Sequence, residues 1–210
     1  MGKKLIKYLI YAVAVISVVY PVIVWYGRVD LALDNTLLLN LFPVFGLLAF
    51  TIMWLHVVGG ALRPWLEKYI DFQRFVSKSS VIVLFLIILH PLLLFTGIGF
   101  QNAGSVLGLY DSKYIRLAII AWFILVGYDV AKRFKNRQFF VKHWETVKLI
   151  STIGFFLALS HSLGLGSDLQ AGPLRSVWIF YGVSAAIAAV YTYGVRKFLK
   201  QNKSDYKSRA

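Results

Sequence analysis

Residues 79–100 read SSVIVLFLIILHPLLLFTGIGF, an apolar stretch that contains no acidic residue, lysine or arginine. A helix that rises about 1.5 Å per residue needs roughly 20 such residues to cross a hydrocarbon core of about 30 Å. Lipid offers the backbone no hydrogen-bond partner, so a crossing segment must pair its own peptide groups as an α-helix. The stretch therefore predicts a membrane-spanning helix, and it decides the fold class.

Five further apolar stretches complete the prediction of an all-α, six-helix transmembrane bundle. We place the spans at residues 5–26, 38–62, 79–100, 114–132, 145–165 and 175–199. Charged residues make up 15% of the 210 residues, against about 25% in soluble domains. The runs are also too continuous for the alternating strands of an outer-membrane barrel. We divide the chain into an N-terminal anchor helix with its outer loop (1–36), a transmembrane core (37–200) and a polar cytoplasmic tail (201–210).

The lysine and arginine residues predict the orientation, because cytoplasmic loops carry an excess of them. With the N-terminus inside, 19 of the 23 basic residues fall on the cytoplasmic side. The four that fall outside are Arg28, Lys113, Arg116 and Arg175. This distribution predicts a multi-pass cell-membrane protein with both termini in the cytoplasm. It also accounts for the net charge of +14 without nucleic acid, because the basic residues are divided among short cytoplasmic pieces and face anionic lipid.

Three of the four histidines lie within predicted spans, where ionisable residues are costly and mark candidate functional sites. By the rise per residue, His90 lies about 20 Å and His161 about 24 Å from the cytoplasmic ends of their spans. His56 lies only about 9 Å from that face, and His143 lies in a basic loop. Similar depth on two helices that run in the same direction predicts that His90 and His161 can ligate one group.

Two imidazoles at one depth suit the axial positions of a b-type haem. The chain has no cysteine, which excludes thiolate metal sites and covalent c-type haem attachment. Gly154, seven residues before His161, is expected to let a flat ring approach, and Phe155 is expected among the apolar walls. Pro91, directly after His90, is expected to remove a helix hydrogen bond and bend the span.

Other interpretations of the histidines stay open. Each could bond a neighbouring helix as polar glue, at under about 2 kcal/mol. Zinc suits the pair less well, because no carboxylate or cysteine accompanies it at that depth. A small transporter or lipid-handling protein would use the histidines as a proton relay, and a haem-free structural subunit would use them for packing. Few further polar residues in the spans could serve a relay: Thr51, Thr96, Asp129, Ser151, Thr152 and Ser160.

The chain resembles the ferric reductase-like transmembrane domain. This six-helix haem core is shared by ferric reductases, NADPH oxidases and the haem-binding membrane subunit of a bacterial methionine sulfoxide reductase system. The resemblance covers about residues 40–200. It rests on GGALRP at residues 59–64, LHPLL at 89–93, Trp144, and LSH at 159–161.

The resemblance implies that His90 and His161 are axial ligands of a haem iron. Family members carry a second, inner pair of histidines on the same two helices. The corresponding positions hold other residues here, namely Val76 or Ser77 and Val147 or Lys148. One haem b is therefore expected and a second is in doubt, with His56 as a candidate contact for an inner haem or a quinone.

The resemblance further implies electron transfer across the membrane to an acceptor outside the cytoplasm. The donor would be a cytoplasmic flavin or NAD(P)H protein, or a quinone. The loops are too short for a flavin or nicotinamide domain, so the chain is expected to be a component of an oxidoreductase system rather than a complete enzyme. Candidate inner contacts for haem propionates, quinone or an acidic partner are Arg63, Arg74, Lys78 and Lys148.

Overall fold

The computed structural model describes residues 2–29, 31–34, 36–108, 112–196 and 198–199. Its long helices are α1 (Gly2–Tyr26), α2 (Leu37–Ala61), α4 (Phe72–Ile98), α6 (Lys113–Arg133), α7 (Gln138–Leu165) and α8 (Pro173–Val190), which the π-helical segment η4 (Tyr191–Val195) continues. All six are long and apolar enough to cross a membrane, and the described residues contain no strand. The all-α six-helix prediction is confirmed. The predicted tail, 201–210, lies outside the described residues.

Two helices begin about two turns earlier than the apolar pattern predicts, α4 at Phe72 and α7 at Gln138. At the start of α4, the side chain of Asp71 accepts a hydrogen bond of 2.9 Å from the backbone N–H of Arg74. This N-cap satisfies one of the helix's open donors, so the helix can extend into polar sequence beyond the apolar segment. The short elements are α3 (Arg63–Leu66), η1 (Phe100–Asn102), α5 (Ala103–Gly108) and η3 (Ser167–Leu169).

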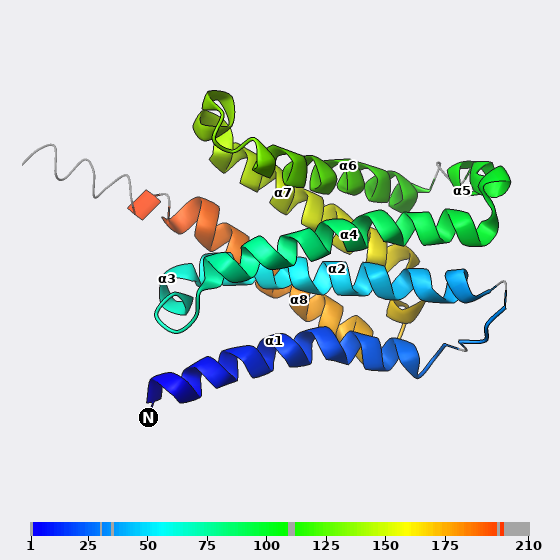
Figure 1. Cartoon of the computed structure of the whole chain (residues 1–210), viewed down its shortest axis with the longest axis horizontal. Coiled ribbons are helices and arrows are strands. Elements are labelled where there is room, and N and C mark those ends of the chain that lie inside the picture. The colour runs from blue at the N-terminus through cyan, green and yellow to red at the C-terminus, as the bar shows by residue number, and fades with distance from the viewer. Residues whose placement is uncertain (1, 30, 35, 109–111, 197, 200–210) are drawn as a thin grey trace, which may run out of the picture.

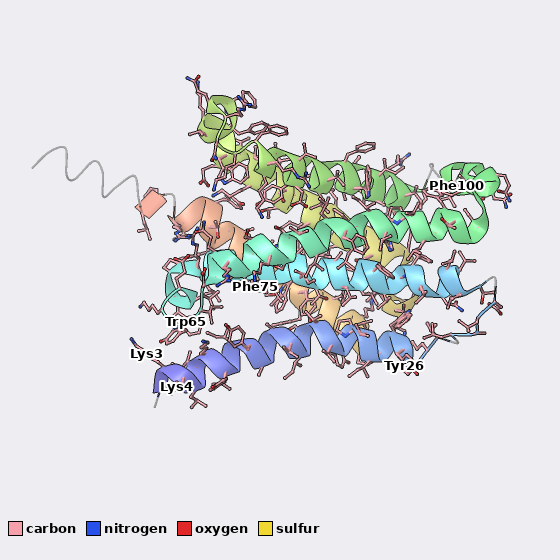
Figure 2. All side chains as sticks on the ribbon, viewed as in Figure 1. Lys3, Lys4, Tyr26, Trp65, Phe75 and Phe100 are labelled. Carbon is pink, nitrogen blue, oxygen red and sulfur yellow. The ribbon has the colours of Figure 1, made fainter. Side chains whose placement is uncertain are left out.

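Helix α2 lies at the centre of the bundle and packs against α4, α8, α1 and α7, while α6 packs along α7 (Figure 1). The six traverses bring the N-terminus, α3 and the α6–α7 connection to the same end of the bundle, which we call the basic end. Figure 2 shows Lys3, Lys4 and Trp65 at that end, and Tyr26 and Phe100 at the other, which we call the far end. The first and last of the six helices therefore have their outer ends at the same end of the bundle.

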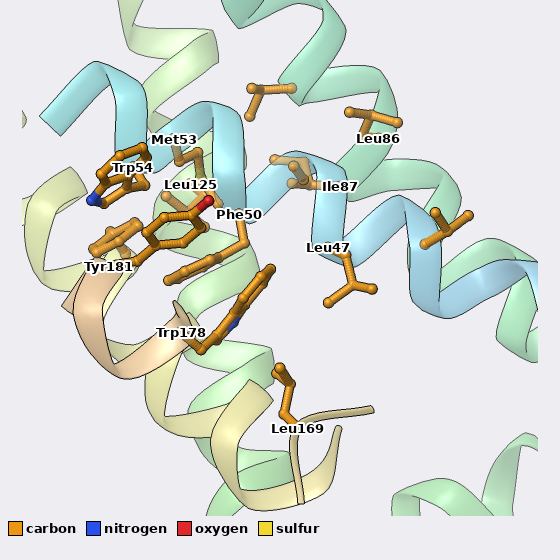
Figure 3. Close-up of a cluster of buried hydrophobic side chains, with 14 of the residues drawn as sticks. Leu47, Phe50, Met53, Trp54, Leu86, Ile87, Leu125, Leu169, Trp178 and Tyr181 are labelled. Carbon is orange, nitrogen blue, oxygen red and sulfur yellow. The ribbon is translucent and has the colours of Figure 1, made fainter. Parts of the chain in front are cut away.

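The centre of the bundle is filled by aromatic side chains from α2, α7 and α8 (Figure 3). Phe50 stacks between Phe155 and Trp178, with ring centroids 4.6 and 5.0 Å away. One turn along, Trp54 stacks on Tyr181 at 4.1 Å. Offset stacking of this kind adds attraction beyond the area that is buried. The stack fixes α8 and α7 against α2 and holds the three helices at defined distances.

A proline in α4 changes how that helix meets α6. Pro91 has no N–H, so the carbonyl of Ile87, four residues earlier, loses its helical partner. The indole N–H of Trp122 in α6 donates to this carbonyl at 2.9 Å. An unpaired carbonyl in a hydrocarbon environment is costly, so the contact compensates for the proline and ties α4 to α6.

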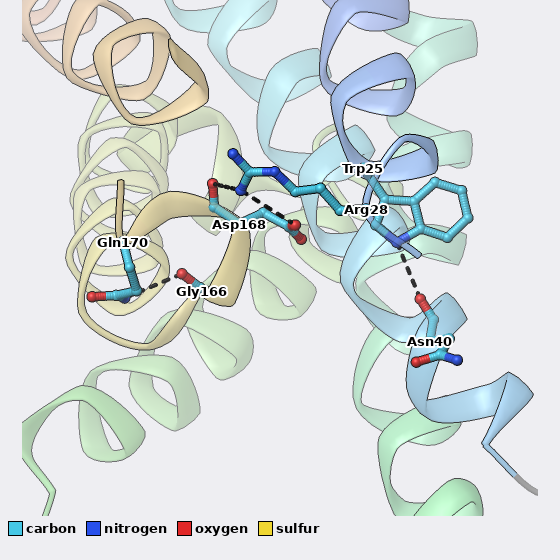
Figure 4. A network of polar contacts seen from close by, with 6 residues as sticks. All are labelled: Trp25, Arg28, Asn40, Gly166, Asp168 and Gln170. Atoms are coloured by element: carbon cyan, nitrogen blue, oxygen red, sulfur yellow. Dashed lines mark hydrogen bonds and ion pairs between the residues drawn. The ribbon is translucent and has the colours of Figure 1, made fainter. Parts of the chain in front are cut away.

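Helix α1 is attached mainly through its far-end half, where its buried residues Pro21 and Trp25 lie. The hydroxyl of Tyr181 donates at 3.1 Å to the carbonyl of Ser17, which Pro21 leaves without its helical N–H. The indole of Trp25 donates at 3.1 Å to the carbonyl of Asn40 (Figure 4). These two hydrogen bonds hold the far-end half of α1 against α8 and α2.

The far end is closed by a contact between the segment after α1 and η3 (Figure 4). One guanidinium nitrogen of Arg28 donates at 3.2 Å to the backbone carbonyl of Asp168 and lies 3.9 Å from its carboxylate. Burial raises the pKa of the Asp168 carboxyl, and the nearby Arg28 opposes this shift. The arginine thus compensates for a carboxylate whose side chain is only 11% exposed.

Candidate functional site

His90 projects from α4 onto α2. Its Nδ1 lies 2.7 Å from the carbonyl oxygen of Phe42, and its ring lies 5.3 Å from the Phe42 ring. Gly46, one turn along α2, lies beneath the imidazole: a Cβ there would be 2.9 Å from Cε1 of His90. Only a glycine leaves room for the ring in this place, so α2 fixes the orientation of the imidazole.

His161 projects from α7 onto α6 in a parallel arrangement. Its Nδ1 lies 3.2 Å from the carbonyl oxygen of Tyr114, near the start of α6. Gly164, three residues further along α7, faces the Tyr114 ring so closely that a Cβ there would overlap it. The glycine lets the two helices approach, and this approach brings the Tyr114 carbonyl within reach of the histidine.

The two carbonyl contacts determine which nitrogen of each ring carries the proton. A carbonyl oxygen can only accept, so Nδ1 of His90 and Nδ1 of His161 must donate. In a neutral imidazole this leaves a lone pair on Nε2, which is the form a metal ligand requires. Neither Nε2 forms a hydrogen bond within the described part of the chain, and neither is sealed from the molecular surface.

The helices that carry His90 and His161, α4 and α7, are not close packing neighbours in the bundle. Helix α4 packs on α2 and α6, and α7 packs on α6, α2 and α8, whereas α4 and α7 are not a closely packed pair. Counted from the far ends of their own helices, His90 lies about 12 Å and His161 about 6 Å along the helix axis.

This donor set fits a haem better than a bare metal ion. The described residues contain no group of three or more histidine, aspartate and glutamate side chains that could hold a metal. Zinc needs three or four protein ligands, whereas a porphyrin supplies four nitrogens and leaves two axial positions. The two Nε2 atoms, each without a hydrogen bond in the described part of the chain, are suitable in kind for those two positions.

Two residues expected beside the histidines lie elsewhere. Gly154 packs against α6, where a Cβ would lie 2.6 Å from a methyl carbon of Ile124, so it serves helix approach rather than a flat ring. Phe155 belongs to the central aromatic stack on Phe50. The prediction that both residues lie beside a haem is therefore not supported by their contacts.

His56 lies in a separate polar cluster toward the basic end. Its Nε2 lies 2.7 Å from the hydroxyl oxygen of Ser79 in α4, and that hydroxyl donates to the carbonyl of Phe75 at 2.7 Å. The serine oxygen therefore accepts from the N–H at Nε2 of His56. Beside it, Lys132 of α6 donates to the buried Ser80. Sequence reasoning missed these serines, although hydroxyls at the start of an apolar span were a usable signal.

The four basic candidates are not gathered around the histidine pair. Arg63 bonds Glu67 at 2.6 Å and Gln73 at 2.8 Å, and Lys148 pairs with Glu145 at 2.6 Å. These ion pairs are exposed and contribute little to stability.

The remaining two, Arg74 and Lys78, line a groove at the basic end. Arg74 lies sixteen residues from His90 along α4, about 24 Å. That separation exceeds the reach of a propionate on a haem ligated by His90, so Arg74 lies too far away for this contact.

Comparisons with protein-family models, with characterised proteins and with solved structures found no match for this chain.

Proposed function

We propose that the chain carries electrons within the membrane through one b-type haem whose axial ligands are His90 and His161, as a ferric reductase-like component of an oxidoreductase system. The observation that supports this most directly is the pair of Nδ1–carbonyl bonds, which leaves a lone pair on the Nε2 of each histidine. When bound, the haem would supply a one-electron iron couple in an apolar setting. The chain's own part is to hold, orient and enclose it.

The donor side of the proposal favours a molecule that enters the bilayer. His90 lies about 20 Å from the basic end of the apolar segment, and electron tunnelling weakens exponentially with distance. A quinone could approach within the membrane, whereas a cytoplasmic flavin or NAD(P)H protein would stop at its surface. Arg63 and Lys148 remain candidate contacts for an acidic partner there, and the acceptor would act on the opposite side.

A reduced-minus-oxidised spectrum of the purified full chain tests the proposal. We expect a low-spin b-type spectrum, about one haem per chain by pyridine haemochrome, and complete release of the haem by acid-acetone, because no cysteine can attach it. A chain purified under haem-replete expression that shows no Soret absorption would refute electron transfer through haem.

The orientation is the first prediction that follows. Reporter fusions at Asn35, Asn102 and Gly172 should read outside the cytoplasm, and fusions at Gln138 and Ala210 should read inside, because the basic residues concentrate at one end. An outside reading at Ala210 would contradict the proposed orientation.

His56 provides a second prediction. Its Nε2 donates to Ser79, so we expect His56→Ala to leave the haem content at about one per chain and to lower thermal stability slightly, as interhelical polar contacts do. Ser79→Ala should have a similar effect on stability. A wild-type ratio near two that falls to one in His56→Ala would instead assign His56 to an inner haem.

A third prediction concerns Gly46. The substitution Gly46→Ala places a methyl group 2.9 Å from Cε1 of His90, so the imidazole must turn or shift. We expect a weaker or high-spin haem signal although both ligands remain. Gly60→Ala, on the same helix with open space around its Cβ, is the matched control and should leave the spectrum unchanged. Equal spectra for the two variants would contradict the placement of His90 on α2.

A further inference from the structure

The basic end contains an open groove of about 780 Å³ between the start of α1 and the segment that joins α3 to α4. Its charged and tyrosine lining residues are Lys7, Tyr11, Glu67, Lys68, Tyr69, Asp71, Arg74 and Lys78. Two further lysines, Lys3 and Lys4, precede it on α1 (Figure 2). The groove therefore carries more positive than negative charge.

The two carboxylates in the groove are already engaged within the chain. Glu67 accepts from Arg63 at 2.6 Å, and Asp71 accepts from the backbone N–H of Arg74 at 2.9 Å. The four cationic side chains, by contrast, form no ion pair with any residue that the structure describes. Lys7 lies over the Tyr11 ring at 5.9 Å. The groove thus presents uncompensated cations and hydroxyl donors to an anion.

The same part of α1 has little protein around it. The buried residues of helix α1 as a whole are Pro21 and Trp25, and both lie in its far-end half. In the basic-end half, Tyr8, Leu9 and Val13 are 66%, 56% and 57% exposed. Leu9 and Val13 share one face of the helix, and Tyr8 lies about 100° away from Leu9. Because these exposed side chains lie on a helix that is apolar and long enough to cross a membrane, hydrocarbon chains are expected to cover them.

We propose that this groove binds the phosphate-bearing headgroup of an anionic membrane phospholipid, whose acyl chains lie between α1 and the rest of the bundle. The cations suit a phosphate, and the excess of positive charge favours an anionic over a zwitterionic headgroup. The apolar flank of α1 favours a lipid over free phosphate. The inference is independent of haem binding.

Native mass spectrometry of the full chain, titrated in detergent with phosphatidylglycerol or phosphatidylcholine, tests the proposal. We expect one tight phosphatidylglycerol adduct and weaker phosphatidylcholine binding. The variant Arg74→Gln/Lys78→Gln should weaken phosphatidylglycerol binding about 30-fold, because each basic group near an anionic lipid is worth roughly a fivefold change in affinity. The matched control Arg137→Gln/Lys142→Gln removes the same charges from the end of the α6–α7 connection and the start of α7, and should bind like wild type.

Three results would overturn the assignment: equal binding of both lipids, equal weakening in the groove variant and the control, or displacement of the lipid by millimolar inorganic phosphate, which would identify a free-phosphate site. If the first variant does not fold, Lys7→Gln/Lys68→Gln, at exposed groove positions on α1 and on the α3–α4 segment, serves the same test. Binding by that variant at wild-type affinity would equally refute the proposal.

Discussion

Replacing either His90 or His161 by alanine is expected to abolish the low-spin haem spectrum. Each substitution removes one axial nitrogen and leaves at most five-coordinate iron, so the bound fraction should lose its low-spin bands and haem should be lost during purification. Reduced-minus-oxidised spectra and pyridine haemochrome ratios measure both effects. Added imidazole should restore part of the low-spin signal in either variant, because it can occupy the vacated position.

The controls for this experiment lie on the same chain. The His143 ring lies 4.9 Å from the Phe139 ring, at a tilt, near the basic end, so His143→Ala should leave the spectrum unchanged. The two ligand variants should also resemble each other, since both histidines use the same tautomer toward a backbone carbonyl. Normal spectra in both His90→Ala and His161→Ala would show that these histidines are not the axial ligands. Loss of haem in only one of the two variants would mean that a different residue provides the other axial ligand.

The six helices could be predicted from sequence because each segment that crosses lipid must pair its own backbone N–H and C=O groups, which is a local requirement. Each apolar stretch must satisfy its own backbone, so composition and length decide the outcome without knowledge of neighbours. The early starts of α4 and α7 escaped this reasoning, because polar residues past the membrane surface can continue a helix. At α4 the side chain of Asp71 provides the capping bond, a signal visible in the sequence but too weak to fix a boundary.

The surroundings of the histidines depend on which helices are neighbours, and one sequence does not reveal that. His90 and Phe42 are 48 residues apart and are joined through a backbone carbonyl, which has no sequence signature. His56 and Ser79 are 23 residues apart on different helices. Gly154 shows the same limit, because its small size predicted a close approach correctly but the wrong partner. Tertiary neighbours, rather than local propensity, determine these roles.

The second large effect is expected at Trp122. We expect Trp122→Phe to lower the free energy of unfolding by about 1–3 kcal/mol, because the Ile87 carbonyl then has neither an indole nor a helical N–H as donor. Equilibrium unfolding in mixed micelles, followed by circular dichroism, measures the change. Part of the loss will come from the smaller ring, so the single variant does not isolate the hydrogen bond.

A double-mutant cycle with Pro91 separates the two contributions. Pro91→Ala supplies a backbone N–H that can pair with the Ile87 carbonyl inside α4. In that background the carbonyl no longer depends on Trp122, so Trp122→Phe should cost less than it does beside the native proline. The difference between the two costs is the coupling energy, which we expect to be about 0.5–2 kcal/mol.

The structure contains an independent copy of this arrangement that serves as a control. Pro21 of α1 frees the carbonyl of Ser17, and the Tyr181 hydroxyl of α8 donates to it at 3.1 Å. Tyr181→Phe combined with Pro21→Ala should show coupling of the same sign, whereas Trp122→Phe combined with Pro21→Ala should be additive, because these two residues share no partner. Two results would mean that the aromatic donors do not replace the hydrogen bonds that the prolines remove. One is coupling between Trp122→Phe and Pro21→Ala. The other is no coupling within the Trp122/Pro91 and Tyr181/Pro21 pairs. Matched coupling at both sites would establish that each proline is tolerated in its span because a neighbouring helix supplies the missing donor.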